Sequence, residues 1–429
     1  MADDVVYLPA RDPKAKGATS TGGACCCPAD AFGIEDIEVA ERTAAAAPHQ
    51  LGGGGVEDRS MRLVALARAP DGVRLAYDVR SRDEASMPLL RAGTSLSRRY
   101  SRRLAEIGVR AVWLHDEDVV GVSALPPLDE AARAEVERRV VRVMAEAAQG
   151  IRRGLPVSGA VVRRLGAIAR SIAERLSATP EAAYAFMDLA GADAYTHRHS
   201  LNVTVLGLML ADRHWRRWGW LDWQGQRRHD RHDERLVKLG FGLLVHDLGK
   251  LAVPPEILHK PGALDAGEWA VMRRHPELGV AMLEPADVSP LSLDVVRSHH
   301  ERLDGSGYPR GLVGGQVHEF ARIAAIVDTY DAIVSDRVYQ AGRPRHIALN
   351  ILAADTPDKY DPDLFETFGT IAVPFPVGTE IPLPNGGSGV VVDVDVDDPW
   401  ILTARIPQGR QVPVDLTHLD ARRALASRV

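Results

Sequence analysis

The chain has 429 residues, 45% of them hydrophobic and 26% charged, which is ordinary for a globular protein and enough for two or three structural units. A formal net charge of −6 gives no general attraction for nucleic acid or an anionic membrane, so a DNA-binding protein of the usual basic kind is excluded. No apolar run reaches the roughly 18–20 residues that span a bilayer, and the start lacks the pattern of a secretion signal. We therefore expect a cytoplasmic protein without a membrane span.

The first 120 residues divide into a low-complexity leader and a small module. Residues 1–55 are rich in Ala, Gly, Pro and Thr, and the adjacent Cys25, Cys26 and Cys27 are poor disulfide partners. We expect a disordered leader with reduced thiols. Residues 56–120 contain β-like runs at 62–67, 73–79 and 111–114 and a helical pattern at 97–107, which predict a small α+β module.

Two long helical patterns occupy residues 121–177. Residues 128–148 and 157–177 repeat apolar residues at intervals of three and four, and their polar faces are rich in arginine. The helices either connect and dimerise the chain or cap the domain that follows. The pattern favours neither interpretation.

The remaining chain predicts a helical domain and a C-terminal β unit. Residues 178–370 are dominated by helical patterns. In the tryptophan- and arginine-rich segment 212–234, the polar end is expected to form an exposed loop or interface, and the tryptophans are expected to cover adjacent helices. After residue 371, β-prone runs at 378–381, 389–394 and 401–406 alternate with Pro, Gly, Asn and Asp clusters. We predict a mainly α protein whose helical domain is flanked by a small α+β module and a small β unit at 371–429.

Two histidine-rich clusters lie in the helical domain. His246 and Asp247 follow an apolar stretch and precede Gly249-Lys250, where the glycine suits a helix C-terminus. The second cluster is His299-His300-Glu301, followed by a loop, residues 304–309, with two glycines and one tyrosine. A Gly-rich loop directly after a His-His-Glu run is more typical of an active-site wall than of a structural turn.

Further candidate ligands surround these clusters. His275 stands between them, and Asp328 interrupts an apolar helix, where a carboxylate is unfavourable unless it is paired or binds metal. Asp331 on the same face is explained equally well by a salt bridge. Of His197 and His199, about 200° apart on a helix, only one can face the site. The set predicts one polynuclear metal centre and a metal-dependent phosphohydrolase.

These motifs together resemble the HD-GYP family of bacterial cyclic di-GMP phosphodiesterases, a branch of the HD phosphohydrolases. The resemblance covers roughly residues 178–370 and is specific because many ordered elements agree at once. The N-terminal module more weakly resembles the sensory or partner domains that precede such units. The matching elements, in chain order, are Tyr195-Thr196, His199-Ser200, His246-Asp247, Gly249-Lys250, His275-Pro276, His299-His300-Glu301, Asp304-Gly305, Gly307-Tyr308-Pro309, Asp328-Thr329-Tyr330-Asp331 and Ser335-Asp336-Arg337.

The resemblance implies an all-helical HD-type metallohydrolase domain that opens cyclic di-GMP to pGpG, and it leaves open whether the end product is pGpG or GMP. It places phosphate contacts at Lys250 and Arg337 and substrate contacts at Gly307, Tyr308 and Pro309. Asp247 takes the bridging role between metals. The implied metal ligands are His199, His246, Asp247, His275, His299, His300 and Asp328.

Two departures from the family pattern refine this expectation. Some members have a glutamate that helps to hold a third metal where this chain has Tyr195, so we predict two divalent ions. A basic residue often found three positions after Arg337 is Gln340 here, which removes one possible phosphate cation. Ligands without thiolate suit iron or manganese at least as well as zinc.

The implied mechanism uses no protein nucleophile. Two ions roughly 3.5–4 Å apart would activate a bridging water as hydroxide, while Lys250 helps to neutralise the charge on phosphate. Asp304 is a candidate for passing a proton to the leaving oxygen. The alternatives are an HD phosphohydrolase for another cyclic nucleotide, and a catalytically silent signalling module. A homodimer or a signalling partner protein is also possible.

Overall fold

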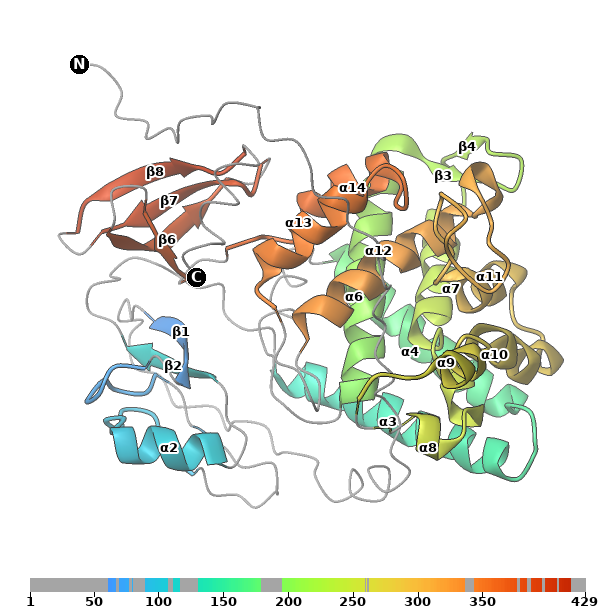
Figure 1. Cartoon of the computed structure of the whole chain (residues 1–429), viewed down its shortest axis with the longest axis horizontal. Coiled ribbons are helices and arrows are strands. Elements are labelled where there is room, and N and C mark those ends of the chain that lie inside the picture. Colours follow the sequence, from blue (N-terminus) through green and yellow to red (C-terminus); the bar gives the residue numbers. More distant parts are fainter. Residues whose placement is uncertain are drawn as a thin grey trace.

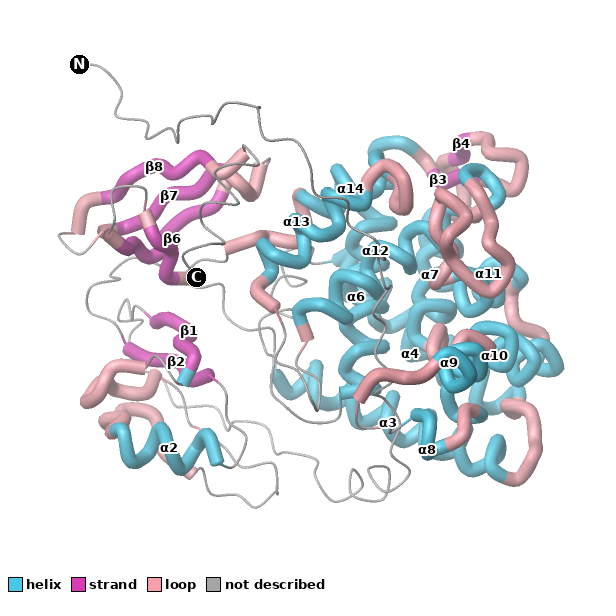
Figure 2. Tube along the Cα trace, viewed as in Figure 1, coloured by secondary structure: helices cyan, strands magenta, loops and turns pink. Residues whose placement is uncertain are grey.

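The computed structural model describes residues 61–66, 69–76, 79, 89–106, 111–115, 130–178, 195–258, 260, 262–335, 343–375, 379–383, 387–395, 398–406 and 409–417. The expected leader, Arg337 and Gln340 lie outside these residues. The described part is mostly helical, with small antiparallel sheets toward both ends of the chain (Figures 1 and 2). The predicted mainly α fold is confirmed.

The N-terminal module contains one antiparallel strand pair and one helix. Strand β1 (Met61–Ala65) pairs with β2 (Ala111–His115), and α2 (Arg98–Glu106) precedes β2. A separate small core holds the module together, because Leu75, Leu96 and other leucines bury their side chains there. The predicted strand at 73–79 was wrong as a continuous strand, since its described residues form only isolated bridges.

Helices α3 (Glu130–Arg152) and α4 (Gly159–Ala178) belong to the packing of the helical domain. Helix α4 packs along α7 (His232–Leu244), and α3 packs along α4. Apolar side chains of α4 such as Leu165 and Ile172 are buried in the same core as those of α7. This packing favours the interpretation of these helices as a cap on the domain.

Five helices and their ends position the centre of the domain. Beside α7, these elements are α6, Tyr195–Trp218; the short helix η3, Leu248–Ala252; α10, His275–Leu283; α11, Pro290–Ser298; and α12, Glu319–Val334. Helices α7 and α12 each pack against both α6 and α11, and α10 packs against α11 and η3, so the elements form one bundle (Figure 1). The remaining helices are α8, Pro255–Leu258; α9, Ala266–Met272; η4, Glu284–Ala286; η5, Gly314–Gln316; α13, Arg345–Asp355; and α14, Pro362–Gly369.

A close backbone contact joins η3 to α10. A Cβ atom on Gly249 would collide with the carbonyl oxygen of His275 and the backbone nitrogen of Gly279. Gly249 therefore allows η3 to approach α10, and the expected role of this glycine at a helix C-terminus was wrong, since α7 ends earlier, at Leu244. The contact brings the residues just before η3 next to His275.

The tryptophan-rich segment is largely folded into the domain. Helix α6 continues to Trp218, and the hairpin of β3 (Trp220–Leu221) and β4 (Arg227–Arg228) follows. Trp215 and Trp220 are buried, as expected of tryptophans that cover neighbouring helices. Residues 223–231 are exposed, in agreement with the polar loop expected there. The buried carboxylate of Glu319 accepts hydrogen bonds from Trp215 Nε1, Leu221 N and Arg227 Nη1, which fixes the start of α12.

The C-terminal unit is a four-stranded antiparallel sheet with the strand order β5-β6-β7-β8. The runs expected at 378–381, 389–394 and 401–406 correspond to β5 (Glu380–Pro382), β6 (Ser388–Val394) and β7 (Ile401–Arg405). Strand β8 (Gln411–Asp415) was not predicted because it contains Pro413, which a strand tolerates at a sheet edge. Within the described residues, no helix is long and apolar enough to cross a membrane.

Candidate metal centre

The seven side chains expected to bind metal converge in the helical domain. His199 lies on α6, His275 begins α10 and Asp328 lies on α12. The two adjacent pairs occupy turns, because His246 and Asp247 follow α7 and His299 and His300 follow α11. All seven are at most 5% exposed, so the centre is a buried polar site inside an apolar domain.

Asp247 belongs to two potential metal-binding groups. One group contains Asp247, His275, His299 and His300, and the other contains Asp247, His246 and His199. Within each group, one nitrogen or oxygen atom per residue lies within 4.8 Å of the others. Because each carboxylate has two oxygens, Asp247 can serve both groups at once.

Backbone carbonyls fix the tautomers of three histidines. Nδ1 of His246 lies 2.7 Å from the carbonyl oxygen of Leu243, and Nδ1 of His275 lies 2.9 Å from that of Met272. Nδ1 of His299 is likewise 3.0 Å from a carbonyl oxygen, that of Val296. A carbonyl only accepts, so each Nδ1 carries the proton and each neutral ring keeps a lone pair on Nε2. These Nε2 atoms are thereby prepared to bind metal.

Burial keeps the histidines of one group neutral while the carboxylates stay ionised. It lowers the pKa of His275 to about 4, and it holds the pKa values of His299 and His300 well below the usual range. Burial alone would raise the pKa values of Asp247 and Asp328, but nearby cationic and hydrogen-bonding groups hold them well below the usual range. Neutral imidazole and ionised carboxylate are the forms that bind metal.

His199 is oriented by a second carboxylate. Its Nδ1 lies 2.7 Å from Oδ2 of Asp331, whose Oδ1 accepts a hydrogen bond from Asn202, and its Nε2 lies 3.1 Å from Oδ1 of Asp328. Burial lowers the pKa of His199, but the hydrogen bonds to Asp328 and Asp331 outweigh it and raise the pKa to about 9. Sequence reasoning left the role of Asp331 open and missed Asn202, although both lie one turn from a ligand on the same helix.

The polar atoms of the site fit a divalent cation. Four buried atoms lack any hydrogen-bond partner, namely Nε2 of His246, Oδ1 of Asp247, Nε2 of His300 and Oδ2 of Asp328. Buried polar atoms without partners are unfavourable in a folded protein. A cation would satisfy these atoms, because each comes from a residue type that binds metal.

Lys250 is joined to the centre through Asp247. Its ammonium donates a hydrogen bond of 2.8 Å to Oδ2 of Asp247, and its side chain is 16% exposed. The cation therefore lies at the edge of the buried centre, where it can meet an anionic ligand.

The loop after His299 and His300 is held by Glu301. This buried carboxylate accepts hydrogen bonds from the backbone nitrogens of Arg310 and Leu312. A Cβ atom on Gly307 would collide with the backbone of Glu301, so a glycine is required where the loop folds back. The fold-back seats Tyr308 against His300.

Asp304 lies in the turn that opens the loop. It is exposed, and its carboxylate accepts hydrogen bonds from the nitrogen and hydroxyl of Ser306, which stabilise the turn. Its partial burial raises the pKa, but the bonds from Ser306 outweigh it and leave the pKa lowered. The proton-donor role of Asp304 stays a prediction, and it requires a protonated form that this lowered pKa disfavours.

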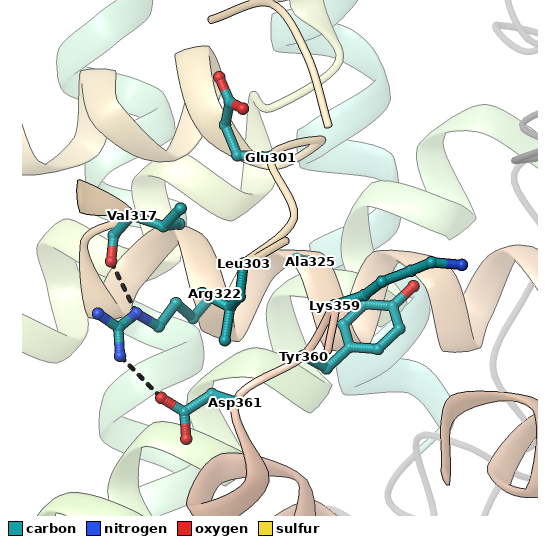
Figure 3. A pocket seen from close by; sticks show the side chains of 8 residues that line it. All are labelled: Glu301, Leu303, Val317, Arg322, Ala325, Lys359, Tyr360 and Asp361. Carbon is teal, nitrogen blue, oxygen red and sulfur yellow. Dashed lines mark hydrogen bonds and ion pairs between the residues drawn. The ribbon is translucent and has the colours of Figure 1, made fainter. Parts of the chain in front are cut away.

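An ion pair between Arg322 and Asp361 lies beside the start of the loop that follows His300. Arg322 donates to the carbonyl oxygen of Val317 and to Asp361, beside Tyr360 (Figure 3). The pocket here also includes Glu301, and Figure 3 shows the Arg322 guanidinium held between Val317 and Asp361. None of the seven ligand candidates lines this small space.

The chain is similar to known HD-domain proteins. A family model of the HD domain matches residues 222–364, which include every ligand candidate except His199. Over 315 residues the chain is 33% identical to cyclic di-GMP phosphodiesterase PA4108 of Pseudomonas aeruginosa, and the match covers 68% of this chain and 72% of that protein.

Two further relatives share shorter segments. A cyclic di-GMP phosphodiesterase of Thermotoga maritima is 33% identical over 162 residues, covering 37% of this chain and 44% of that protein. The 3′3′-cGAMP-specific phosphodiesterase 2 of Vibrio cholerae is 45% identical over 98 residues, covering 22% of this chain and 19% of that protein.

Proposed function

Because the chain belongs to the HD-GYP family of HD-domain phosphohydrolases, we propose that it is a metal-dependent phosphodiesterase that hydrolyses cyclic di-GMP. Two of the relatives described above are named as cyclic di-GMP phosphodiesterases. The observation that carries the proposal is the place of Asp247 in both potential metal-binding groups. A shared carboxylate between two buried ligand sets suits a two-metal hydrolytic centre.

In the proposed centre, Asp247 would contribute to the ligand sets of both ions. One ion would be held by His199, His246 and Asp328 together with Asp247, and the other by Asp247 with the remaining three histidines, His275, His299 and His300. Nitrogen and oxygen ligands without thiolate suit iron or manganese at least as well as zinc, and we propose iron or manganese. The presence of Tyr195 in place of a further acidic ligand supports two ions rather than three.

The residues of the chain have defined roles in the proposed reaction. When bound, divalent ions supply an activated water and neutralise phosphate charge. Lys250 adds a cation at the edge of the centre. Tyr308 orients His300 through their stacked rings, and Gly307 and Pro309 shape the same loop.

The products and other phosphate contacts follow from the family resemblance. We propose cleavage to pGpG and onward to GMP. The phosphate contact of Arg337, the cytoplasmic location and a homodimer or protein partner stay predictions.

A second candidate substrate is a different cyclic dinucleotide. It is favoured by the 3′3′-cGAMP-specific relative, which shares higher identity with this chain over a shorter segment. The same centre would carry out the chemistry, and the residues around the bases would set the preference.

The test couples metal analysis to turnover on one anaerobic preparation. We expect about two ions of iron or manganese per chain and hydrolysis of cyclic di-GMP faster than that of 3′3′-cGAMP or cyclic di-AMP. Asp247→Ala should lose both metal and turnover while keeping its circular dichroism spectrum. A wild-type preparation with a full metal complement but no activity on any cyclic dinucleotide would instead indicate a silent signalling module.

A further inference from the structure

Tyr308 is covered on its ring faces by two different groups. Its ring stacks on the metal-ligand candidate His300, with centroids 4.6 Å apart and an interplanar angle of 29°. The guanidinium carbon of Arg273 lies over the same ring, 4.8 Å from its centroid. Tyr308 itself is only 7% exposed. The tyrosine ring is therefore part of the protein's own packing and is not an open platform for a base.

Arg273 is held by an aromatic ring and not by a carboxylate. Arg310 and Arg322, which lie near the same loop, are paired with Asp294 and Asp361. Among the described residues, no carboxylate forms an ion pair with Arg273, and its side chain is exposed. Its charge and its N–H groups are therefore available to a ligand, while the cation–π contact restrains the position of the guanidinium.

Trp269 stands beside Arg273 on a rigid support. The two residues are one helical turn apart on α9, and Trp269 is half-buried with its ring edge-on to Tyr308 at 6.2 Å. Helix α9 begins with a complete capping box formed by Asp265 and Glu268. Trp269 packs against a small apolar cluster that includes Met272. The aromatic ring is thus presented in a fixed position next to the guanidinium.

From this arrangement, and resting on the proposed function, we infer that Arg273 and Trp269 form a guanine-recognition site at the rim of the metal centre. An arginine that approaches guanine in the base plane can donate two hydrogen bonds to O6 and N7, which adenine cannot accept in the same way. A neighbouring tryptophan supplies a stacking surface for the base. The phosphate would meet the metals and Lys250, and a base would extend toward Arg273.

The experiment measures base preference without depending on turnover of a dinucleotide. Hydrolysis of bis(p-nitrophenyl) phosphate, which has no base, reports the metal centre, and inhibition of this reaction by cyclic di-GMP or cyclic di-AMP reports binding of each dinucleotide. Variants are Arg273→Ala, Arg273→Lys, Trp269→Ala and Trp269→Phe. Arg274→Ala is the matched control, because Arg274 is an exposed neighbour and it is Arg273, not Arg274, that lies over the Tyr308 ring.

We expect Arg273→Ala and Arg273→Lys to raise the inhibition constant of cyclic di-GMP by about tenfold or more, since each bidentate base contact contributes about 1–3 kcal/mol. The constant for cyclic di-AMP and the hydrolysis of bis(p-nitrophenyl) phosphate should stay the same. Trp269→Ala should weaken both dinucleotides, and Trp269→Phe should restore them. Arg274→Ala should resemble the wild type.

Other outcomes overturn the inference. Equal weakening of both dinucleotides by Arg273→Ala, with full rescue by Arg273→Lys, would show that only charge matters. If Arg273→Ala changed the inhibition constant of neither dinucleotide, Arg273 would have only a structural role. If cyclic di-GMP failed to inhibit the wild-type enzyme, the proposed substrate would be refuted. This result concerns the wild type, so it is distinguishable from the two results with Arg273→Ala.

Discussion

The Nε2 atoms of His275 and His299 lie 3.2 Å apart in a fully buried site. The Nδ1 atom of each ring faces a backbone carbonyl and carries the proton, so both Nε2 atoms present lone pairs. Burial lowers the pKa of both rings, so neither is cationic at neutral pH. Two lone pairs at this distance repel each other unless a cation lies between or beside them.

Metal removal should therefore destabilise the folded protein. A metal present at about 100 times its dissociation constant adds ~2.7 kcal/mol to the free energy of unfolding, because it binds only the folded state. Chelation should lower the melting temperature of the wild type, and added manganese or iron should restore it. His299→Ala should bind less metal and show a smaller chelator effect. An unchanged melting temperature after verified metal loss would contradict this account.

Asp331→Ala should weaken metal binding without removing a ligand. Asp331 holds Nδ1 of His199, and loss of such supporting carboxylates lowers metal affinity about 10- to 100-fold. Activity should recover at high metal concentration, as measured by titration of the chelated enzyme. Asn202→Ala should have a smaller effect, because Asn202 contacts the carboxylate and not the histidine. If Asp331→Ala were as active as the wild type at limiting metal, Asp331 would not support metal binding.

Gly249→Ala should disrupt the approach of η3 to α10. The added methyl group collides with the backbone at His275, and relief of the collision must move Asp247 or His275. We expect a loss of at least ~3 kcal/mol in the free energy of unfolding, together with a lower metal content. The matched control is Gly166→Ala in α4, where a Cβ meets nothing within 4 Å. That change should stabilise the protein by ~0.5–1 kcal/mol.

Asp304→Asn tests whether Asp304 donates a proton. Asparagine keeps the hydrogen bonds that form the turn, so turnover should stay within about threefold of the wild type. Loss of a general acid would instead lower the rate by about 10²–10⁴. Single-turnover rates with cyclic di-GMP at saturating metal distinguish these values. A fall in the rate by about 10²–10⁴ would show that Asp304 donates the proton.

His318 should make the stability of the fold depend on pH. Burial and then the nearby Arg322 and Arg235 lower its pKa from 6.5 to about 4, and its Nδ1 accepts the hydrogen bond from Phe320 N that caps α12. Below pH 6.5 the unfolded chain binds a proton that the folded state excludes, so stability falls between pH 6.5 and 4.

The measurement is urea unfolding of wild type and His318→Asn at pH 7 and pH 5. Asparagine caps a helix without titrating, so the variant should lose less stability than the wild type over this interval. An identical loss in both proteins would mean that His318 does not contribute to the pH dependence.

Several parts of the molecule could be predicted from the sequence because they depend on local patterns. The apolar periodicity of the helices marks their existence, and the family motifs mark the seven ligand candidates that converge in the structure. The ends of elements were less accurate. Helix α6 continues to Trp218, where Trp215 stacks on Phe320, a contact between distant parts of the chain that local periodicity cannot indicate.

The sequence by itself determined the residue types of the centre and the family to which the chain belongs. Only the tertiary structure decided which atom of each residue faces the metal position, because the tautomer of a histidine depends on the carbonyl that its other nitrogen meets. The tertiary structure likewise assigned Asp331 to His199, made Asp304 a turn residue and placed Arg273 over Tyr308. These relationships join residues that are distant in the chain or depend on the local turn geometry, and so no spacing in the sequence encodes them.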